Sequence, residues 1–183
     1  MKTQPHYILG TAGLNIIKTS EGLKLKAYLC PTNKLTIGYG HVILPTRDHL
    51  LFKAFDATAL QRIIYACRSI RKLTREAAGL FISPAQADTL LRNDTQQVAE
   101  FISSITRPDL TPNQFDALVS LVFNIGQGNY CDSTLRIKLK AGDFAGAAAE
   151  FDRWVFATVD GKKIKLAGLV TRRAAERALF EGI

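Results

Sequence analysis

Residues 21–41 read EGLKLKAYLCPTNKLTIGYGH, and this stretch decides the fold. Apolar and polar residues alternate over 23–30, a pattern typical of a half-buried strand. The PTNK that follows supplies turn residues, and LTIGYGH predicts a second, returning strand. With a loop of residues 31–35, Cys30 and Thr36 would face each other across the two strands and look into a cleft. We therefore expect one small β-hairpin here and no other convincing sheet in the chain.

Glu21 closes the helix that precedes this hairpin. The pattern predicts a helix from about Thr11, as N-cap, to Glu21, with Gly22 just past its end. Glu21 falls at the border of the apolar arc that contains Leu14, and it sits where the helix dipole disfavours an anion. Both effects favour a protonated carboxyl, which can act as a general acid. From the helix alone, a surface glutamate before a C-capping glycine is the simpler interpretation.

Most of the remaining chain has helical periodicity. SPAQ at 83–86 and TPNQ at 111–114 each combine an N-cap, a proline and a glutamine in the order of a capping box. The first predicts a helix of roughly twenty residues from Ser83, and the second predicts a helix that stops at Gly126. Shorter helices are expected at about 133–141, 143–154 and 169–180. These elements predict an α+β fold, mainly helical, with a small N-terminal β-hairpin lobe, a long inter-lobe helix and a helical C-terminal lobe.

We expect a single bilobal domain over 1–183. The small β-containing lobe would comprise about 20–82, including residues 44–81, and the helical lobe about 83–183 together with the N-terminal helix. Within 44–81, residues 60–75 predict a basic amphipathic helix, which can lie on a membrane or an anionic polymer. An ordinary surface helix with a solvated charged face is the commoner interpretation. The apolar stripe consists of Leu60, Ile63, Ile64, Cys67 and Ile70, opposite Arg62, Arg68, Arg71 and Lys72.

The composition bounds the partners and the compartment. The chain has 183 residues, a formal net charge of +8 and a pI near 9.6, which favours polyanionic partners. Its cations are scattered, as at Arg172, Arg173 and Arg177, and no zinc-ligand spacing or phosphate-binding loop accompanies them, so we predict a basic surface and no nucleic-acid partner. Three cysteines are too few for a disulfide scaffold, which predicts free thiols and synthesis in a reducing cytoplasm. Neither a secretory signal nor a membrane span is visible.

The chain resembles a known family of enzymes. Glu21, Cys30 and Thr36, followed by IGYGH, match the catalytic signature of the phage-type lysozymes, glycoside hydrolase family 24, in the variant with cysteine at the second position. The similarity continues through RND at 92–94, LTPNQFDALVSLVFNIGQGNYCDSTL at 110–135, RW at 153–154 and GLVTRRAAERALF at 168–180. Residues 44–81 lie outside it and resemble an insertion relative to many members. It implies a lysozyme-like fold and hydrolysis of the β-1,4 bond between N-acetylmuramic acid and N-acetylglucosamine in peptidoglycan, with no cofactor and no metal.

The resemblance also implies roles for the three signature residues. Glu21 would protonate the glycosidic oxygen, Cys30 would handle the attacking water or the developing positive charge, and Thr36 would help to hold that water. In an inverting scheme the two catalytic groups stand about 6.5 to 9.5 Å apart. Many members have aspartate where this chain has Cys30, and an ordinary thiol is mostly neutral at pH 7. We expect Cys30 to position water, with a minor thiolate fraction as base.

Further residues take roles from the same comparison. Asp94 falls on the apolar stripe of the long helix, where a carboxylate needs a partner. His41 matches the family position that pairs with it, so we predict a stabilising, noncatalytic ion pair that raises the pKa of His41. Gly38 and Gly40, two apart, would leave one side of the returning strand bare for an extended ligand. The candidate substrate-binding residues are Gly38, Tyr39, Val42, Phe123, Asn124 and Ser133.

The biological setting implied by the resemblance is that of a phage endolysin. Such a protein waits in the host cytoplasm, reaches the cell wall through a holin-type lesion and acts on peptidoglycan glycan strands. The positive charge would draw it to anionic envelope polymers, and we expect a monomer with no stable membrane insertion. Two alternatives stay open: a lytic transglycosylase, which leaves an anhydro sugar, and a noncatalytic wall-binding or membrane-active basic protein working through residues 60–75.

Overall fold

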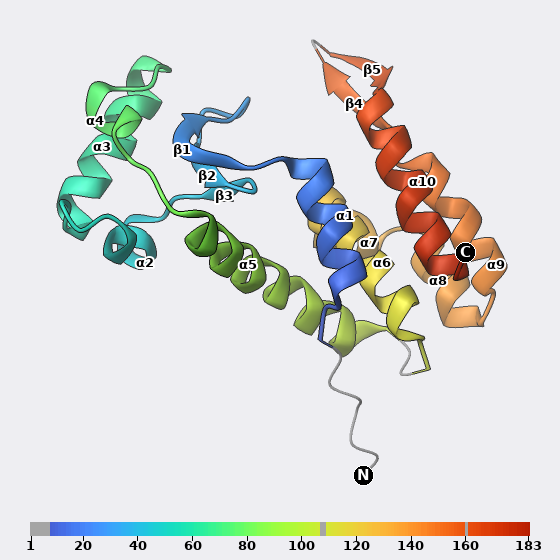
Figure 1. The fold of residues 1–183 in the computed structure, drawn as a ribbon. Coiled ribbons are helices and arrows are strands. Elements are labelled where there is room, and N and C mark those ends of the chain that lie inside the picture. Colours follow the sequence, from blue (N-terminus) through green and yellow to red (C-terminus); the bar gives the residue numbers. More distant parts are fainter. Residues whose placement is uncertain (1–7, 107–108, 160) are drawn as a thin grey trace. The chain divides into compact units, whose positions relative to one another are not determined.

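The structure is a computed structural model that describes residues 8–106, 109–159 and 161–183. The chain divides into two compact units (Figure 1). One, the sheet-bearing unit, is Glu21–Asp94, and the other, the helical unit, comprises the residues through Ser20 together with Thr95–Ile183. The long helix α5, Pro84–Ile105, contributes residues to both units. The division between the units falls after Asp94, within α5, whereas the sequence analysis placed the limit of the small lobe near residue 82.

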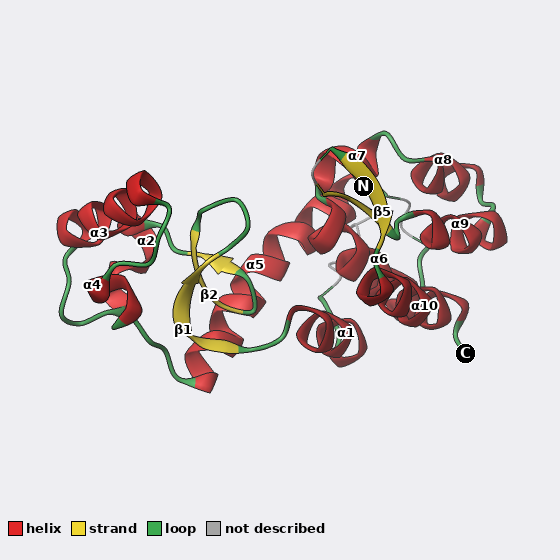
Figure 2. Cartoon of the chain, turned by 90° about the horizontal axis from the view of Figure 1, so that it is seen from above, coloured by secondary structure: helices red, strands yellow, loops and turns green. Residues whose placement is uncertain are grey.

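The sheet-bearing unit is built on three antiparallel strands in the order β1–β2–β3. They are β1 Lys24–Leu29, β2 Leu35–Gly38 and β3 His41–Val42. Figure 2 labels β1 and β2 of this sheet. The predicted hairpin is present, but its loop is tighter than 31–35, because Leu29 pairs with Leu35 and the Cys30 amide donates to the Lys34 carbonyl at 3.0 Å. The residue opposite Thr36 is consequently Tyr28. The expected direct pairing of Cys30 with Thr36 is wrong by this shift in register.

Residues 44–81 form a small helical layer on this sheet. They contain α2 Pro45–Asp48, a 3-10 turn His49–Leu51, α3 Ala57–Ile70 and α4 Arg75–Ala78. The segment after α4 joins the sheet edge, since the Ala27 amide donates to Leu80 at 3.0 Å and the Ile82 amide donates to Leu25 at 3.0 Å. The amphipathic pattern of α3 is confirmed except at Ile70, which is 57% exposed because the helix ends there. Buried side chains of this core include Ala27, Leu35, Ile37, Leu60, Ile63, Cys67, Ala77, Leu80, Ile82 and Leu90.

The predicted starts of the helices after Ser83 and Thr111 are confirmed. The Ser83 amide donates to the Gln86 side chain at 2.8 Å and the Gln86 amide donates to Ser83 Oγ at 3.2 Å, which is the capping box at the start of α5. Thr111 and Gln114 form the same box before α6, Pro112–Ile125, and Gly126 follows the last residue of that helix. The core of the helical unit includes Ile102, Phe115, Leu118, Val119, Val122, Tyr130, Leu135, Leu139, Phe151 and Phe180.

The first helix, α1 Thr11–Glu21, is capped from another helix rather than by Thr11. The buried Asp116 carboxylate in α6 accepts the amides of Gly10 at 2.7 Å and Gly13 at 2.9 Å. A negative charge at a helix N-terminus is favourable because it faces unpaired amides and the positive end of the dipole. The approach requires glycine, since a Cβ on Gly13 would lie 2.9 Å from the Asp116 backbone oxygen. The expected role of Thr11 as N-cap is therefore wrong.

The C-terminal part contains more elements than the sequence predicts. The helices are α7 Gln127–Cys131, α8 Thr134–Ala141, α9 Phe144–Glu150 and α10 Ala167–Glu181, with a 3-10 turn Phe151–Arg153 after α9. A second antiparallel hairpin, β4 Phe156–Val159 with β5 Lys162–Lys165, lies before α10. The expectation of only one sheet is thus wrong. All four residues of β5 are exposed, so the alternation that marks a half-buried strand is missing.

Two of the arginines that we assigned to a basic surface are buried. Arg172 and Arg173 in α10 are 4% and 0% exposed and enclose the carboxylate of Glu176, which is 0% exposed. Glu176 Oε1 accepts from Ser120 Oγ at 2.7 Å and from Arg172 Nε at 3.0 Å, and Oε2 lies 2.7 Å from Arg173 Nε. Arg172 also donates to the Ser120 carbonyl at 3.1 Å. This charged cluster fastens α10 to α6.

The three cysteines are free thiols, as expected: Cys67 is buried, whereas Cys30 and Cys131 are half-buried. Across residues 8–106, 109–159 and 161–183, no helix is long and apolar enough to cross a membrane.

Candidate active site

Glu21 stands at the end of α1, where Gly22 takes a left-handed φ of +70° and stops the helix. Its side chain is half-buried. A Cβ on Gly40, which lies in the turn between β2 and β3, would come 3.7 Å from Glu21 Oε2. The carboxylate therefore points across the turn of the sheet. Gly40 also has a φ of +90°, so both backbone conformation and proximity to Glu21 favour glycine there.

Cys30 and Thr36 share one face of the hairpin, as the alternation predicted, but they are diagonal neighbours. Cys30 Sγ lies 3.0 Å from Thr32 Oγ1, and the Thr36 hydroxyl donates to the Lys34 carbonyl at 2.9 Å. Thr36 is only 2% exposed, whereas Cys30 is half-buried. Tyr28 occupies the position directly opposite Thr36. The sequence analysis placed Tyr28 on this face but gave it no role.

The surroundings of Cys30 shift its protonation toward the thiolate. Burial acts to raise the pKa of the thiol, but hydrogen bonds from the Thr32 side chain and from the Lys34 and Thr32 backbone outweigh it, so the pKa is lowered. The pKa of Tyr28 is raised, first by burial and then by the negative charges of Cys30 and Glu21. Tyr28 is thus within electrostatic reach of both groups. Lys24 Nζ lies over this ring, 4.0 Å from its centroid.

Gly38 does not offer a bare surface to a ligand. A Cβ at this position would lie 3.6 Å from both the Ala87 Cβ and the Ile82 Cδ1, so the space beside it is filled by the core. Its φ of +68° is the reason for glycine. The expectation that Gly38 and Gly40 leave one open strand face is therefore wrong. Tyr39 and Val42, the other candidate substrate-binding residues of this unit, are half-buried.

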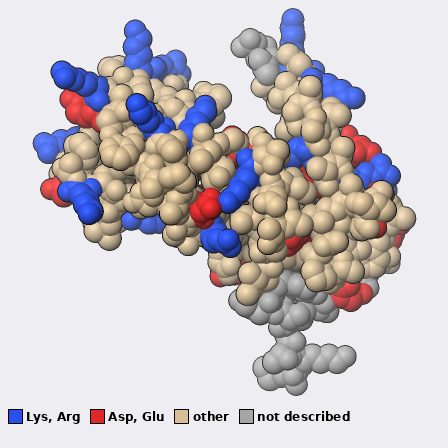
Figure 3. All heavy atoms as spheres, in the orientation of Figure 1, with Lys and Arg blue, Asp and Glu red and all other residues tan. Residues whose placement is uncertain are grey.

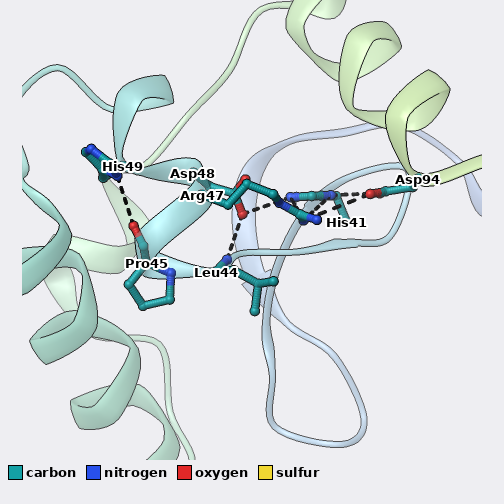
Figure 4. Close-up of polar contacts among 7 residues, drawn as sticks. All are labelled: His41, Leu44, Pro45, Arg47, Asp48, His49 and Asp94. Atoms are coloured by element: carbon teal, nitrogen blue, oxygen red, sulfur yellow. Dashed lines mark hydrogen bonds and ion pairs between the residues drawn. The ribbon is translucent and has the colours of Figure 1, made fainter. Parts of the chain in front are cut away.

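His41 lies between two carboxylates (Figure 4). Its Nδ1 is 2.7 Å from Asp94 Oδ2, which is the contact expected from the sequence, and its Nε2 is 3.0 Å from Asp48 Oδ2. Asp48 also accepts the Leu44 amide at 2.7 Å and Arg47 Nε at 3.0 Å. Sequence reasoning missed Asp48 because it lies in the 44–81 segment, where no periodic pattern indicated which side chains turn inward.

The two carboxylates hold His41 in its charged form. Burial lowers the pKa of His41, but the hydrogen bonds and charges of Asp48 and Asp94 outweigh it and raise the pKa from 6.5 to about 9. The Arg47 guanidinium lies 3.0 Å from Nε2 and opposes protonation, so the carboxylates must overcome its charge as well. For Asp48, burial acts to raise the pKa, but bonds from His41, Leu44 and Arg47 lower it overall. An imidazolium can donate from both ring nitrogens, which matches an acceptor on each side.

This network predicts a pH-dependent stability. Because the pKa of His41 is raised on folding, its contribution is complete below pH 6.5 and is lost as the pH rises to about 9. We expect His41→Gln to lower the free energy of unfolding by about 3 kcal/mol near pH 6, and by much less above pH 9. Urea unfolding of wild type and variant across this range measures the difference.

The matched control for that prediction is His49→Gln. His49 belongs to the same unit, and its Nδ1 contacts the Pro45 carbonyl at 3.1 Å rather than a carboxylate. Its variant should show no comparable loss at low pH. A His41→Gln difference that stays constant from pH 6.5 to 9 would show that the carboxylates do not hold an imidazolium.

The helical unit holds the other candidate binding residues. Phe123 is half-buried and Asn124 is exposed, both near the end of α6. Ser133 is 5% exposed, and its hydroxyl caps α8 by accepting the Arg136 amide at 3.1 Å while it donates to the Tyr130 carbonyl at 2.7 Å. Ser133 still lines a pocket of about 400 Å³ that also includes Trp154. Its main observed role is the helix cap.

Within the described ranges, no group of three or more His, Cys, Asp or Glu side chains could hold a metal ion. The groups that the structure gathers at this hairpin are the Glu21 carboxyl, the Cys30 thiol and the hydroxyls of nearby Tyr and Thr side chains.

The sequence is similar to one protein family and to several proteins named endolysin. The chain matches the Phage lysozyme family over residues 18–176. An endolysin of Acyrthosiphon pisum secondary endosymbiont phage 1 is 41% identical over 169 residues, which cover 92% of this chain and 94% of that protein. The endolysin of Salmonella phage P22 is 33% identical over 172 residues, covering 94% and 97%.

Solved structures agree with this assignment. The muramidase domain of SpmX from Asticaccaulis excentricus has a TM-score of 0.72 at 32% identity and covers 95% of this chain and 97% of that one. The endolysin from Escherichia coli O157:H7 phage FAHEc1 has a TM-score of 0.73 at 31% identity, with coverage of 97% and 96%. The mainly helical, lysozyme-like α+β fold expected from the sequence is confirmed. The chain belongs to the phage lysozyme family.

Proposed function

We propose that this protein is an endolysin muramidase that hydrolyses the β-1,4 bond between N-acetylmuramic acid and N-acetylglucosamine in bacterial peptidoglycan. The observation that carries the proposal is the placement of the Glu21 carboxylate beside the Gly40 turn, in electrostatic reach of the Tyr28 ring on the Cys30 and Thr36 face. A proton donor at the end of a helix and water-binding groups on the adjacent hairpin are the parts that glycosidic hydrolysis requires. Relatives named endolysin and muramidase support it.

In this mechanism Glu21 donates its proton to the glycosidic oxygen as the bond breaks. The Thr36 hydroxyl gives its own hydrogen to the Lys34 carbonyl, so its lone pairs are left to accept a hydrogen bond from water. The lowered pKa of Cys30 increases the fraction of molecules in which this side chain is a thiolate. In that fraction, the Cys30 thiolate accepts a proton from the attacking water. The water attacks the anomeric carbon on the face opposite the leaving group, which inverts the configuration.

Cys30 variants test the hairpin half of this mechanism. We expect Cys30→Ala to lower the turnover of purified sacculi about a hundredfold, because the group that activates water is lost, and Cys30→Asp to retain activity, because a carboxylate can take the same role. The readout is release of soluble muropeptides. Cys131→Ala, which removes another half-buried thiol, is the matched control and should be unaffected. Full turnover by Cys30→Ala would make Cys30 a spectator.

The proposal also assigns the residues that contact the substrate and the place where the enzyme acts. Tyr39, Val42, Phe123 and Asn124 contact the glycan strand, within one bilobal domain that acts as a monomer without a cofactor. The enzyme is made in the host cytoplasm and reaches the wall through a holin-type lesion. Its net charge of +8 then favours adsorption to anionic envelope polymers.

A further inference from the structure

The segment that joins α3 to α4 is strongly basic and reads RSIRKLTR over residues 68–75. It carries four cations and no acid, and all four are exposed. Two aliphatic side chains stand among them: Ile70 is 57% exposed and Leu73 is 38% exposed. The chemistry proposed above uses none of these side chains. We call the set the basic turn; it consists of Arg68, Ile70, Arg71, Lys72, Leu73 and Arg75.

The charge of the basic turn is only partly balanced by its surroundings, since Glu76, the next residue in the chain, interacts electrostatically with Arg75. In the described part of the chain, none of its four cations forms an ion pair, whereas Arg177 pairs with Asp152 at 2.6 Å and with Glu181 at 3.1 Å. Figure 3 shows Lys and Arg side chains projecting from the part of the sheet-bearing unit where α3 and α4 lie. The basic turn therefore presents a positive field to whatever approaches this face.

Arg71 is held in a backbone conformation that suits glycine. It is the C-cap of α3 with φ 55° and ψ 31°, in the left-handed region. Helices commonly end there with glycine, because any Cβ is strained in this region. An arginine at this position places a charge where the fold alone would favour glycine. Such an outlier points to a role outside folding.

We propose that the basic turn docks this protein onto an anionic phospholipid membrane. Four cations attract the negative lipid headgroups, and clusters of this size are sufficient for adsorption to acidic membranes. Ile70 and Leu73 enter the boundary between headgroups and acyl chains, where exposed aliphatic side chains lose contact with water. The binding is peripheral and reversible, and it concentrates the enzyme at the membrane surface.

The apolar members of the basic turn distinguish a membrane from a nucleic acid. Phosphate contacts to nucleic acids gain little from aliphatic side chains, and single strands are bound by stacking bases on aromatic rings. The segment 68–75 contains no aromatic residue. Its cations and the exposed Ile70 and Leu73 instead suit a lipid bilayer, which has anionic headgroups at its surface and apolar acyl chains directly below them.

Vesicle binding by the full chain tests the proposal. Co-sedimentation with vesicles of phosphatidylcholine and phosphatidylglycerol gives a partition coefficient, and vesicles of phosphatidylcholine alone give the baseline. Each cation near an acidic surface contributes about a fivefold gain, so the triple variant R68Q/K72Q/R75Q should lose about a hundredfold in partition. The matched control is K162Q/K163Q/K165Q, which removes the same charge from the exposed strand β5. It should lose much less.

Two further variants separate the causes. Arg71→Gly should weaken partition about fivefold while it leaves the melting temperature unchanged or raised, because glycine relieves the left-handed strain. The double variant I70S/L73S should weaken binding even in high salt, where charge is screened. Sacculus hydrolysis should stay at the wild-type level in all of these variants, which keeps this test independent of the proposed function.

Three results would overturn the proposal: an equal loss in the β5 control, equal binding to vesicles of phosphatidylcholine alone, or tighter binding to an oligonucleotide than to the acidic vesicles. The first would show that adsorption follows net charge rather than this surface.

Discussion

Replacing Glu21 with glutamine should reduce the hydrolysis of purified sacculi by about a thousandfold, within the range that general acids contribute. Glutamine has the same shape but no transferable proton, so the leaving oxygen would depart as an unprotonated alkoxide. The end of α1 and the Gly40 turn should tolerate the change, because the Glu21 side chain is only half-buried. The measurement is the initial rate of muropeptide release, with thermal unfolding recorded beside it to show that the variant is folded.

The control for Glu21→Gln is Glu76→Gln, which removes an exposed carboxylate from the same unit. It should leave the rate unchanged. If Glu21→Gln keeps more than a tenth of the wild-type rate, the proton comes from another group and the proposed mechanism is wrong.

Replacing Glu176 with glutamine should lower the free energy of unfolding by about 3 to 5 kcal/mol, the typical cost of removing one partner from a buried charged cluster. Arg172 and Arg173 are 4% and 0% exposed, so the variant removes the negative charge that Glu176 places against two buried guanidinium groups. The amide can still accept from Ser120 Oγ, and the substitution creates no cavity. Urea unfolding at neutral pH gives the difference directly.

Glu181→Gln is the matched control for this second prediction. Glu181 lies on the same helix, is exposed, and pairs with Arg177 at 3.1 Å. A surface pair of this kind is typically worth about 1 kcal/mol or less. Similar losses in the two variants would show that the buried cluster does not hold α10 to α6.

Much of this architecture could be predicted because local signals agree with tertiary structure. The two capping boxes at Ser83 and Thr111 satisfy backbone amides within a few residues, so they depend little on the rest of the fold. The ends of α1 at Gly22 and α6 at Gly126 follow from glycine with positive φ. The strong alternation of 23–30 identified the first hairpin, and the proposed catalytic residues Glu21, Cys30 and Thr36 lie in one continuous stretch.

Other features depend on contacts that no local pattern records. The register of β1 and β2 follows from a tight turn with Asn33 at φ 57°, and one residue more or less in that turn changes which side chain opposes Thr36. Asp116 is buried against Gly10 and Gly13, which lie far away in the chain. Asp48 contacts His41, only seven residues before it, but no periodic pattern marks Asp48 as inward-facing. The burial of Arg173 breaks the usual rule for arginine and is stable only because Glu176 lies inside the same core.

The second hairpin left one signal that could have found it. Residues 160–161 are Asp-Gly, a pair that favours tight hairpin turns, and Gly161 has a φ of +76°. The exposed strand KKIK at 162–165 lacks an inward-facing apolar row, so periodicity gave no support. Turn chemistry is the better indicator for a strand pair that is exposed on both faces.

Mass spectrometry of the products from purified sacculi tests the central claim most directly. If Cys30 and Thr36 hold the attacking water, hydrolysis should give muropeptides that end in reducing N-acetylmuramic acid. The same digest in heavy-oxygen water should place the heavy oxygen at that reducing end. Unlabelled 1,6-anhydro muropeptides, or intact glycan strands, would contradict the account.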